Sequence, residues 1–446
     1  MGDRVQPERA VGLAPGRVRD HRGLRRHSEY GRKRQLMTLP PDLDTDAGAL
    51  RAAMVKGLAG ATADADADAR CPVHPAWLAA AEKVPRHAFV PGFYLPADEP
   101  DAQGLTVWEP VTAKLDYGRW LAAAYSDATL ITQFDGEKTD WERPAVRHGG
   151  APTSSSTLPS LVLRMWSDAD VVEGHTVLEV GTGTGYSTAL ACERLGSSHV
   201  SSVEVDAVRL EGAADALYGC GYTPVLARAD GLYGYWPEAW FDRIVAACSF
   251  RSVPPALLSQ TRPGGKVLLP LSGWLYGNAR VLLTAAGDGT AEGPLLPGTI
   301  SFMPARAHAA PAYGNPSDWA AGLHEEPPRS ARHAPERLTA ATEEAFHLRF
   351  LAQGAVPDAQ LVTVDGAPHL IDVVSGSVAT LTPDSGAWSV REGGPLKLWS
   401  RIEGLIDAFD AAGRPGPETF TLRVDDDGQR LLHARLPQLR LPQPVR

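Results

Sequence analysis

The chain has 446 residues, 43% of them hydrophobic, and a formal net charge of -10. A single hydrophobic core stops growing near roughly 250 to 300 residues, so we expect two domains. The acidic balance argues against a nucleic-acid-binding protein, because neutralising phosphates requires a basic face. The four cysteines are scattered, without a CxxC pair or histidines at zinc spacing, which argues against a disulfide framework and a metal site.

The N-terminal segment lacks the features of a membrane span or a secretion signal. No stretch approaches the roughly 18 apolar residues that would span a bilayer, so we expect a cytoplasmic protein without a membrane partner. Residues 1–36 are rich in arginine and poor in apolar side chains, which predicts disorder. A nucleic-acid-binding arm and a true start at Met37 are the alternatives. The Ala-Asp alternation of Ala61–Ala69 is typical of a solvated linker, so residues 1–70 are predicted to be a disordered basic tail and linker.

The middle of the chain alternates short β-branched runs with helical stretches, which is typical of a parallel α/β sheet. Before it, His74–Val84 has helical spacing and is stopped by Pro85. Crossover helices are expected around Ala189, Ala213 and Ala256. Strands are predicted at Thr176–Gly181, Val200–Asp206, Pro224–Asp230, Asp242–Ser249 and Lys266–Leu271, with late edge strands at Val281–Ala285 and Gly298–Met303. The main strands are apolar on both faces, so the sheet should be covered on both sides.

A smaller domain is predicted to follow residues 305–345, a linker dense in Ala, Pro, His and Arg. Its short strands are separated by glycine-containing turns, which is typical of antiparallel hairpins. The predicted strands are Leu361–Val364, His369–Val374, Val378–Leu381 and Trp388–Arg391. A helix at Leu396–Ala412 and a hairpin that turns at Asp425–Gly428 complete a predicted α+β domain over residues 346–446.

The most informative segment is Val177–Ser187, a strand followed by a glycine-rich turn and a helix start. Glycine lets the backbone turn sharply and approach a ligand, and the helix N-terminus offers free N–H groups. Nucleotide Rossmann sites use GxGxxG, whereas GxGxG after an acidic strand end is the pattern that methyltransferases use around the sulfonium and aminoacyl group of S-adenosylmethionine. The cofactor contacts predicted here are Glu179, Gly181, Thr182, Gly183, Gly185 and Tyr186.

Acidic residues also end the next two predicted strands. Glu204 stands where a carboxylate can accept both ribose hydroxyls, and Asp230, followed by Gly231, can accept from the adenine amino group. Because the carboxyl ends of parallel strands share one crevice, these residues together predict an S-adenosylmethionine site. A tight turn without a ligand and ordinary solvated carboxylates are the alternatives. Cys248 follows a predicted buried strand without a neighbouring histidine, so a core thiol is favoured over a nucleophile.

Several motifs recur together in one known family. They are Val84–Pro91, Ala124–Asp127, the Ser/Thr run before Pro159, the glycine loop, Ser202–Glu204, Ala229–Gly231 and Phe241–Val245. In order and spacing, the region from Pro85 to about Leu271 resembles the protein-L-isoaspartate O-methyltransferases. The resemblance implies a doubly wound, Rossmann-like class I methyltransferase sheet with an N-terminal helical extension, here over residues 71–304.

The resemblance also implies an acceptor site. The family places a hydroxyl residue beside the transferring methyl, two positions before the motif's proline, and Thr157 stands there instead of the usual serine. Ser155 matches the family's other hydroxyl and Ser156 extends the run, so these three are the predicted catalytic residues. A helix N-cap is the alternative reading. A carboxylate with a pKa near ~4 is already ionised at neutral pH, so methyl transfer needs alignment more than a base.

The chain departs from the family's repair enzymes by an insertion at Asp135–Gly150 and by a long C-terminal extension. With the polyserine run and Ala246–Ser249, these features resemble an actinobacterial branch associated with ribosomally made peptide natural products. That branch methylates an aspartate of a constrained peptide, and the next backbone amide then expels methanol to leave an aspartimide. This is the predicted function, with a modified ribosomal peptide as the partner. Repair of L-isoaspartyl proteins is the alternative, and a catalytically inactive binding module is another.

The extra domain has two readings. It is predicted to recognise the peptide, by adding a strand to an exposed hairpin edge. A module for stability or dimerisation is the alternative.

Overall fold

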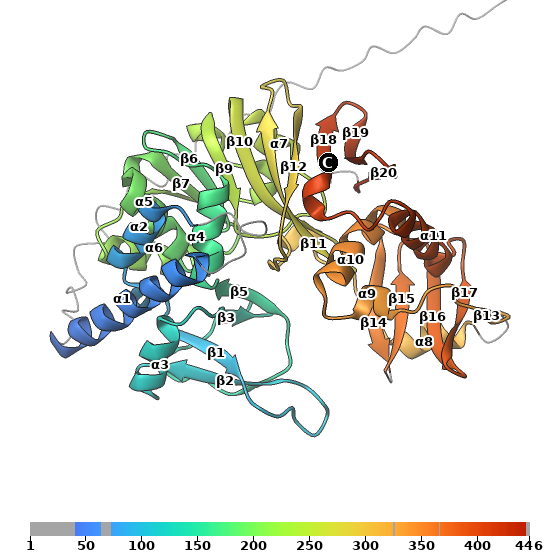
Figure 1. The fold of residues 1–446 in the computed structure, drawn as a ribbon. Coiled ribbons are helices and arrows are strands. Elements are labelled where there is room, and N and C mark those ends of the chain that lie inside the picture. Colours follow the sequence, from blue (N-terminus) through green and yellow to red (C-terminus); the bar gives the residue numbers. More distant parts are fainter. Residues whose placement is uncertain (1–40, 64–72, 324–325, 365, 443–446) are drawn as a thin grey trace, which may run out of the picture. The chain divides into compact units, whose positions relative to one another are not determined.

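The computed structural model describes residues 41–63, 73–323, 326–364 and 366–442 (Figure 1). Its first element is a helix, α1 (Pro41–Ala63), so the prediction of a disordered tail over residues 1–70 is wrong for that range. Ala47, Met54, Val55 and Leu58 are buried along α1, at spacings that place them on one helical face. The arginine-rich residues 1–36 and most of the Ala-Asp alternation lie outside the described residues.

The predicted helix before Pro85 is α2 (Pro75–Lys83), which His74 caps by accepting from the N–H of Ala76. It is followed by η3 (Arg86–Phe89) and α3 (Tyr117–Ala124). The strands here are β1 (Gly92–Pro96), β2 (Val107–Thr112), β3 (Leu130–Phe134), β4 (Arg147–His148) and β5 (Pro152–Ser156). They form an antiparallel sheet in the order β4-β2-β1-β3-β5. The extension is therefore only partly helical, and its short strands gave no clear period-2 signal in the sequence.

The central sheet has ten strands in the order β20-β19-β18-β12-β11-β10-β9-β6-β7-β8 (Figure 1). The five predicted parallel strands are β6 (Val177–Val180), β7 (Val200–Glu204), β8 (Val225–Arg228), β9 (Phe241–Ala246) and β10 (Thr261–Ser272). Helix α4 (Pro159–Asp168) precedes them, and α5 (Tyr186–Leu195), α6 (Ala207–Gly219) and α7 (Pro255–Ser259) connect them. Short helices η4 (Ser197–His199), η5 (Gly231–Tyr233) and η6 (Trp236–Glu238) lie in the connections.

This is a doubly wound arrangement, as the sequence predicts. The chain runs outward from β6 to β8 and then returns to β9 on the other side of β6. The strand order therefore reverses at β6, and ligands of such sheets bind outside the carboxyl ends of the strands at that point. All four residues of β6 are buried, as a strand covered on both faces requires.

The late edge strands are β11 (Asn278–Ala285) and β12 (Ala291–Leu296). The first contains the predicted Val281–Ala285. The prediction of a strand at Gly298–Met303 is wrong, because the strand that pairs with β11 is the earlier β12. That segment contains Gly293 and Pro294, which from sequence alone favour a turn. Gly293 is needed there: a Cβ at this position would lie 1.9 Å from the carbonyl oxygen of Leu282.

The predicted hairpins after residue 345 form a second antiparallel sheet in the order β13-β17-β16-β15-β14. Its strands are β13 (Arg329–Ser330), β14 (Ala359–Val364), β15 (Ala367–Asp372), β16 (Ser377–Asp384) and β17 (Ala387–Gly393). Its helices are α10 (Glu343–Ala355) and the predicted α11 (Leu398–Ala411). The expected linker 305–345 instead contains η7 (Arg306–His308), α8 (Pro316–Ala321), β13 and α9 (Glu336–Thr339). Ion pairs to α11 hold it, including Arg329 to the buried Glu403 (3.0 Å) and Arg337 to Asp410 (2.8 Å).

The predicted final hairpin is β18 (Thr421–Asp425) and β19 (Gly428–His433), preceded by η8 (Pro417–Thr419) and followed by β20 (Leu436–Arg440). The predicted domain over residues 346–446 would place this hairpin in the second sheet, but the structure does not. The hairpin pairs with β12 and extends the central sheet (Figure 1). An unpaired edge of β12 would expose backbone N–H and C=O groups, and β18 satisfies them. The Gln429 side chain adds two hydrogen bonds of 2.7 Å to the backbone of Val253.

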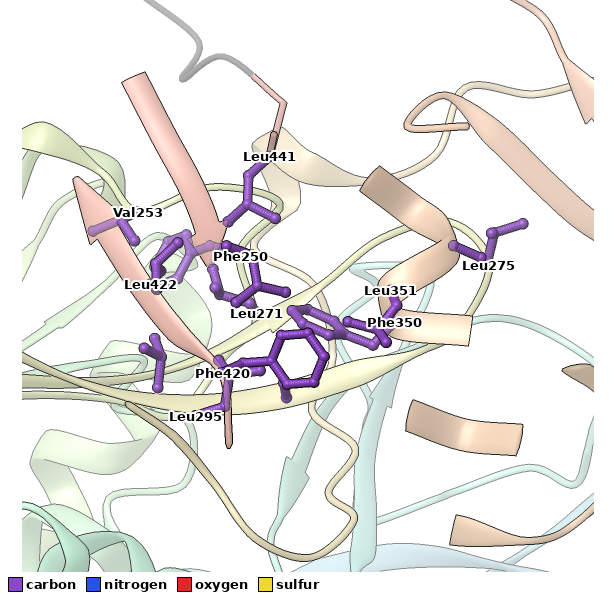
Figure 2. Close-up of a cluster of buried hydrophobic side chains, with 14 of the residues drawn as sticks. Phe250, Val253, Leu271, Leu275, Leu295, Phe350, Leu351, Phe420, Leu422 and Leu441 are labelled. Atoms are coloured by element: carbon purple, nitrogen blue, oxygen red, sulfur yellow. The ribbon is translucent and has the colours of Figure 1, made fainter. Parts of the chain in front are cut away.

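Apolar side chains join this hairpin to its surroundings in one core. Figure 2 shows Phe420 and Leu422 beside Leu295 of β12 and Phe350 of α10. The same cluster includes Leu178 and Ile244, so it is continuous from the parallel strands into the C-terminal elements. No helix in the described ranges is long and apolar enough to cross a membrane.

We expect Phe420→Ala to lower the free energy of unfolding by about 3 to 5 kcal/mol, because it empties a fully buried ring position. Urea unfolding followed by far-UV circular dichroism would measure the loss. Val374→Ala, at a side chain that is 69% exposed, is the matched control and should change stability by less than about 0.5 kcal/mol. A separate early transition that left most of the helix and strand signal unchanged would contradict a shared core.

Candidate active site

The turn after β6 is built from three glycines in conformations that other residues rarely adopt. Gly181, Gly183 and Gly185 have φ of 98°, 55° and 89°. Gly185 is the N-cap of α5, so the free N–H groups of the first helical turn face the end of β6. The turn is anchored to the neighbouring strand, since the N–H groups of Gly181 and Thr182 both donate to the carbonyl of Val203. This arrangement presents backbone donors to a ligand at the carboxyl edge of the sheet.

Glu204 ends β7 with its carboxylate against this loop. Its Oε2 accepts from the N–H of Gly183 at 2.9 Å, and its Oε1 accepts from the N–H of Asp206 at 3.1 Å. The side chain is only partly buried, so part of it is accessible at the carboxyl edge of the sheet. The glycine loop and Glu204 at the end of β7, which the sequence predicts to share one site, are therefore in contact.

Asp230 and Gly231 follow β8 at the same edge. Oδ1 of Asp230 accepts from the N–H of Leu232 at 3.0 Å and caps η5. A Cβ at Gly231 would lie 2.2 Å from Cγ1 of Val180, so only glycine lets this backbone approach the end of β6. Burial raises the pKa of the nearby Cys248 to about 12, with further contributions from the charges of Glu204 and Asp230. The thiol is therefore protonated at neutral pH, which argues against a nucleophile.

Three of the predicted cofactor residues do not direct their side chains toward the crevice. Glu179 is fully buried, and its Oε2 accepts from the hydroxyls of Thr188 and, at 2.9 Å, Ser202. Thr182 is also buried and shares a 2.7 Å hydrogen bond with Ser202. Glu179 and Thr182 thus connect β6, β7 and α5 from inside, and only the backbone of Thr182 is placed at the loop.

Tyr186, the first residue of α5, is the third predicted cofactor residue whose side chain does not face the carboxyl edge of the sheet. Its ring is buried, with its centroid 6.1 Å from that of Phe89 and 5.7 Å from the Arg86 guanidinium carbon. Its position fixes where α5 begins, but its phenol points into the protein.

The serines of the hydroxyl run lie on β5, the edge strand of the N-terminal sheet, and Thr157 follows it directly. The alternation of the strand divides the run into two faces. Ser154 and Ser156 are buried, whereas Ser155 and Thr157 are partly exposed on the opposite side. The Ser156 hydroxyl accepts from Nε of Arg86 at 3.3 Å, so it already has a partner inside the protein, and its predicted catalytic role stays a prediction. The N-cap reading is wrong, because α4 begins after Leu158 without a side-chain cap.

The two halves of the candidate site meet at Ser155. A Cβ on Gly183 would lie 3.7 Å from the Ser155 carbonyl oxygen, so β5 packs directly against the glycine loop. The site therefore combines backbone donors, carboxylates at two strand ends and two hydroxyl side chains. In the described part of the chain, no group of three or more His, Cys, Asp and Glu side chains is placed to hold a metal ion.

The sequence analysis missed a segment that borders this site from beyond β12. The N–H of Ala305 donates to the carbonyl of Ser249, just past β9, at 2.8 Å. Arg306 then reaches Asp206 at 2.6 Å and Gln133 of β3 at 3.3 Å. Burial alone would raise the pKa of Asp206, but hydrogen bonds from Gln133 and Arg306 outweigh it and lower the pKa to about 2. Because Arg306 is far from Asp206 and Gln133 in the sequence, no local sequence pattern could have predicted these contacts.

Burial raises the pKa of Glu179 above its usual 4.5, and hydrogen bonds from Ser187, Thr188 and Ser202 only partly offset this effect. As pH rises, the unfolded chain ionises this group first, so its contribution to stability is lost between 4.5 and the higher folded pKa. Glu179→Gln cannot ionise. We therefore expect the melting temperature of the variant, measured by calorimetry, to increase relative to that of wild type as pH rises from about 4.5 to about 8. Glu211→Gln, on the exposed face of α6, is the control, and a gap independent of pH would contradict the assignment.

Comparisons with known proteins agree with this geometry. "Protein-L-isoaspartate O-methyltransferase 2" of Syntrophobacter fumaroxidans is 36% identical over 148 residues, covering 33% of this chain and 58% of that protein. "Protein-L-isoaspartate O-methyltransferase 1" of Polaromonas sp. is 27% identical over 264 residues, covering 58% of this chain and 92% of that protein. The chain spans little more than half the length of the first curated relatives it matches, at 58%, 61% and 54%.

A solved structure named protein-L-isoaspartate O-methyltransferase aligns with 86% of this chain and 99% of its own, at 20% identity and a TM-score of 0.46. The family model described as "Protein-L-isoaspartate(D-aspartate) O-methyltransferase (PCMT)" matches residues 128–289, from β3 to the end of β11. That span contains the hydroxyl strand, the glycine loop, Glu204 and Asp230. Residues 128–289 therefore resemble the protein-L-isoaspartate O-methyltransferase family, whose model they match.

Proposed function

We propose that this protein is an S-adenosylmethionine-dependent O-methyltransferase that esterifies a carboxylate of a peptide. One observation carries the proposal: the hydroxyl strand β5 packs directly against Gly183, at the edge where Glu204 and Asp230 also lie. The acceptor and the cofactor would then meet across this contact. The family whose model matches residues 128–289, the protein-L-isoaspartate O-methyltransferases, supports the same reaction.

The crevice fits the chemistry of the cofactor. The carboxylate of Glu204 accepts the ribose hydroxyls, and that of Asp230 accepts the adenine amino group. The loop N–H groups and the start of α5 hold the aminoacyl carboxylate. When bound, the cofactor supplies an electrophilic methyl on its sulfonium sulfur. The residues of this chain need only orient the partners, because the acceptor carboxylate is already ionised at neutral pH.

Ser155 and Thr157 are the residues proposed to orient the acceptor. Both lie on the more exposed side of the hydroxyl strand, and their hydroxyls can donate to one carboxylate oxygen while the other attacks in line. Transfer of the methyl to the carboxylate oxygen would leave the electron pair of the broken S–C bond on sulfur. No histidine or lysine base is required.

We further propose that the acceptor is an aspartate of a ribosomally made, constrained peptide. In a second step the following backbone amide attacks the ester carbonyl, and the amide proton leaves with the methoxide as methanol, giving an aspartimide. The segment around Arg306 supports an acceptor that differs from a repair substrate, because it lies outside residues 128–289 yet touches Asp206 and Gln133 beside the site. Repair of L-isoaspartyl residues is the alternative, and it is the activity that the names of the relatives give.

The second sheet and its helices are proposed to recognise the peptide. The sheet is antiparallel and ends at β14 on one side, where the N–H of Leu361 already donates to the carbonyl of Trp274 at 3.4 Å. The rest of this edge is proposed for strand addition. The division into a catalytic part at 71–304 and a recognition part after residue 345 is part of this proposal. It excludes β18 to β20, which belong to the central sheet.

The substrate question is answered by mass spectrometry. A cyclised aspartate-containing peptide encoded beside this gene and a linear isoaspartyl peptide are each incubated with the protein and S-adenosylmethionine. We expect the cyclised peptide alone to gain one methyl and then to lose methanol. Methylation of the isoaspartyl peptide alone would establish repair, and methylation of neither would reject the proposed reaction.

Glu204→Gln should weaken binding of S-adenosylhomocysteine by about 10- to 100-fold, because hydrogen bonds to a charged group contribute about 1.5 to 3 kcal/mol. Isothermal titration calorimetry gives the affinity without requiring turnover. Glu211→Gln serves again as the control and should bind like wild type. No binding by the wild-type protein would favour an inactive scaffold that keeps only the fold.

A further inference from the structure

Arg86 is a buried cation behind the hydroxyl strand that the proposed reaction does not yet use. We propose that Arg86 is a positioning residue: it fixes β5 and the end of α3 relative to each other, so that Ser155 and Thr157 are aligned with the acceptor carboxylate. The inference rests on the proposed function for its chemical meaning. Its structural part stands on the hydrogen bonds of Arg86 alone.

The first set of hydrogen bonds goes to the turn after α3. Nη1 of Arg86 donates to the carbonyls of Ala124 at 3.1 Å and Ser126 at 2.9 Å. Nη2 donates to the carbonyl of Ala128 at 2.9 Å. Three carbonyls of one turn thus converge on a single side chain, which holds that turn in one conformation.

The second set goes to the hydroxyl strand itself. Nη2 also donates to the carbonyls of Ser156 at 3.1 Å and Thr157 at 3.2 Å, and Nε donates to the Ser156 hydroxyl at 3.3 Å. Because alternate residues of a strand face opposite sides, fixing the backbone at Ser156 and Thr157 also sets the direction of the Ser155 and Thr157 side chains. The Arg86 guanidinium therefore orients the Ser155 and Thr157 hydroxyls by holding the backbone from the buried side of the strand.

All of these acceptors are neutral oxygens, although the Arg86 side chain is fully buried. Among the described residues, none of its hydrogen bonds reaches a carboxylate, and Asp127 acts on it only through space. Burial lowers the pKa of Arg86 to about 10, so it stays charged at neutral pH. A buried positive charge without a bonded counter-ion, next to Thr157, favours a ligand that brings a carboxylate.

A lysine at this position would keep the charge but could not make the six hydrogen bonds, which come from three separate nitrogens. Methionine would remove both. Arg86→Lys and Arg86→Met therefore separate the geometric effect from the effect of charge. Arg243→Lys is the matched control, since Arg243 is also buried and donates to the carbonyls of Ala169, Asp170 and Asp242, at the amino ends of the strands.

Three quantities are measured for each variant: S-adenosylhomocysteine affinity, kcat and KM for whichever peptide wild type methylates, and hydrogen exchange of residues 124–128 and 153–158. For Arg86→Lys we expect faster exchange in both segments, a fall in kcat of about 10- to 100-fold and cofactor affinity within about two-fold of wild type. Arg86→Met should in addition raise KM for the carboxylate substrate. Arg243→Lys should leave exchange in these segments and kcat unchanged.

Wild-type exchange in both segments of Arg86→Lys, or a wild-type kcat, would overturn the inference. An equal loss of cofactor affinity and kcat would also overturn it, because it would indicate general unfolding. If wild type methylates neither peptide, the proposed function fails by itself. The exchange data then still decide whether Arg86 holds the two segments.

Discussion

The structure depends on the close approach of the turn after β6 to its neighbours. The turn must leave a buried strand, reverse direction and start a helix, and three glycines with positive φ make this possible. Its N–H groups reach Val203 and Glu204 on one side, and Gly231 admits the end of β6 on the other. These contacts hold the ends of β6, β7 and β8 together. The crevice where a cofactor would bind is the consequence.

Around that crevice, polar side chains divide into those that build it and those that face it. Glu179, Thr182 and Ser202 are buried and bonded to one another, so they stabilise the frame. Glu204 accepts from backbone N–H groups and is only partly buried. On the acceptor side Ser156 is bonded to Arg86 and only its neighbours are partly exposed. The same residue types thus serve as frame or ligand contact according to the face of the strand on which they lie.

The C-terminal extension is integrated with the central sheet. Strand β18 covers the edge of β12, Phe420 enters the shared core, and the segment carrying Arg306 reaches the neighbourhood of Glu204. A residue outside the family region therefore contacts residues at the crevice. In the proposed function, these contacts are where the extension would influence which acceptor enters.

The sequence by itself determined the parallel strands, the glycine loop with Glu204 and Asp230, the α2 helix and the hairpins of the second sheet. Each is a local pattern: period-2 or period-3.6 burial, turn glycines, or an acid at a strand end. Tertiary structure alone decided that Ser156 and Glu179 face inward, that Gly293 and Pro294 lie in a strand, and that the last hairpin pairs with β12. These outcomes depend on partners far along the chain. A residue's own neighbours in sequence carry no record of which edge is unpaired or which side of an edge strand is covered.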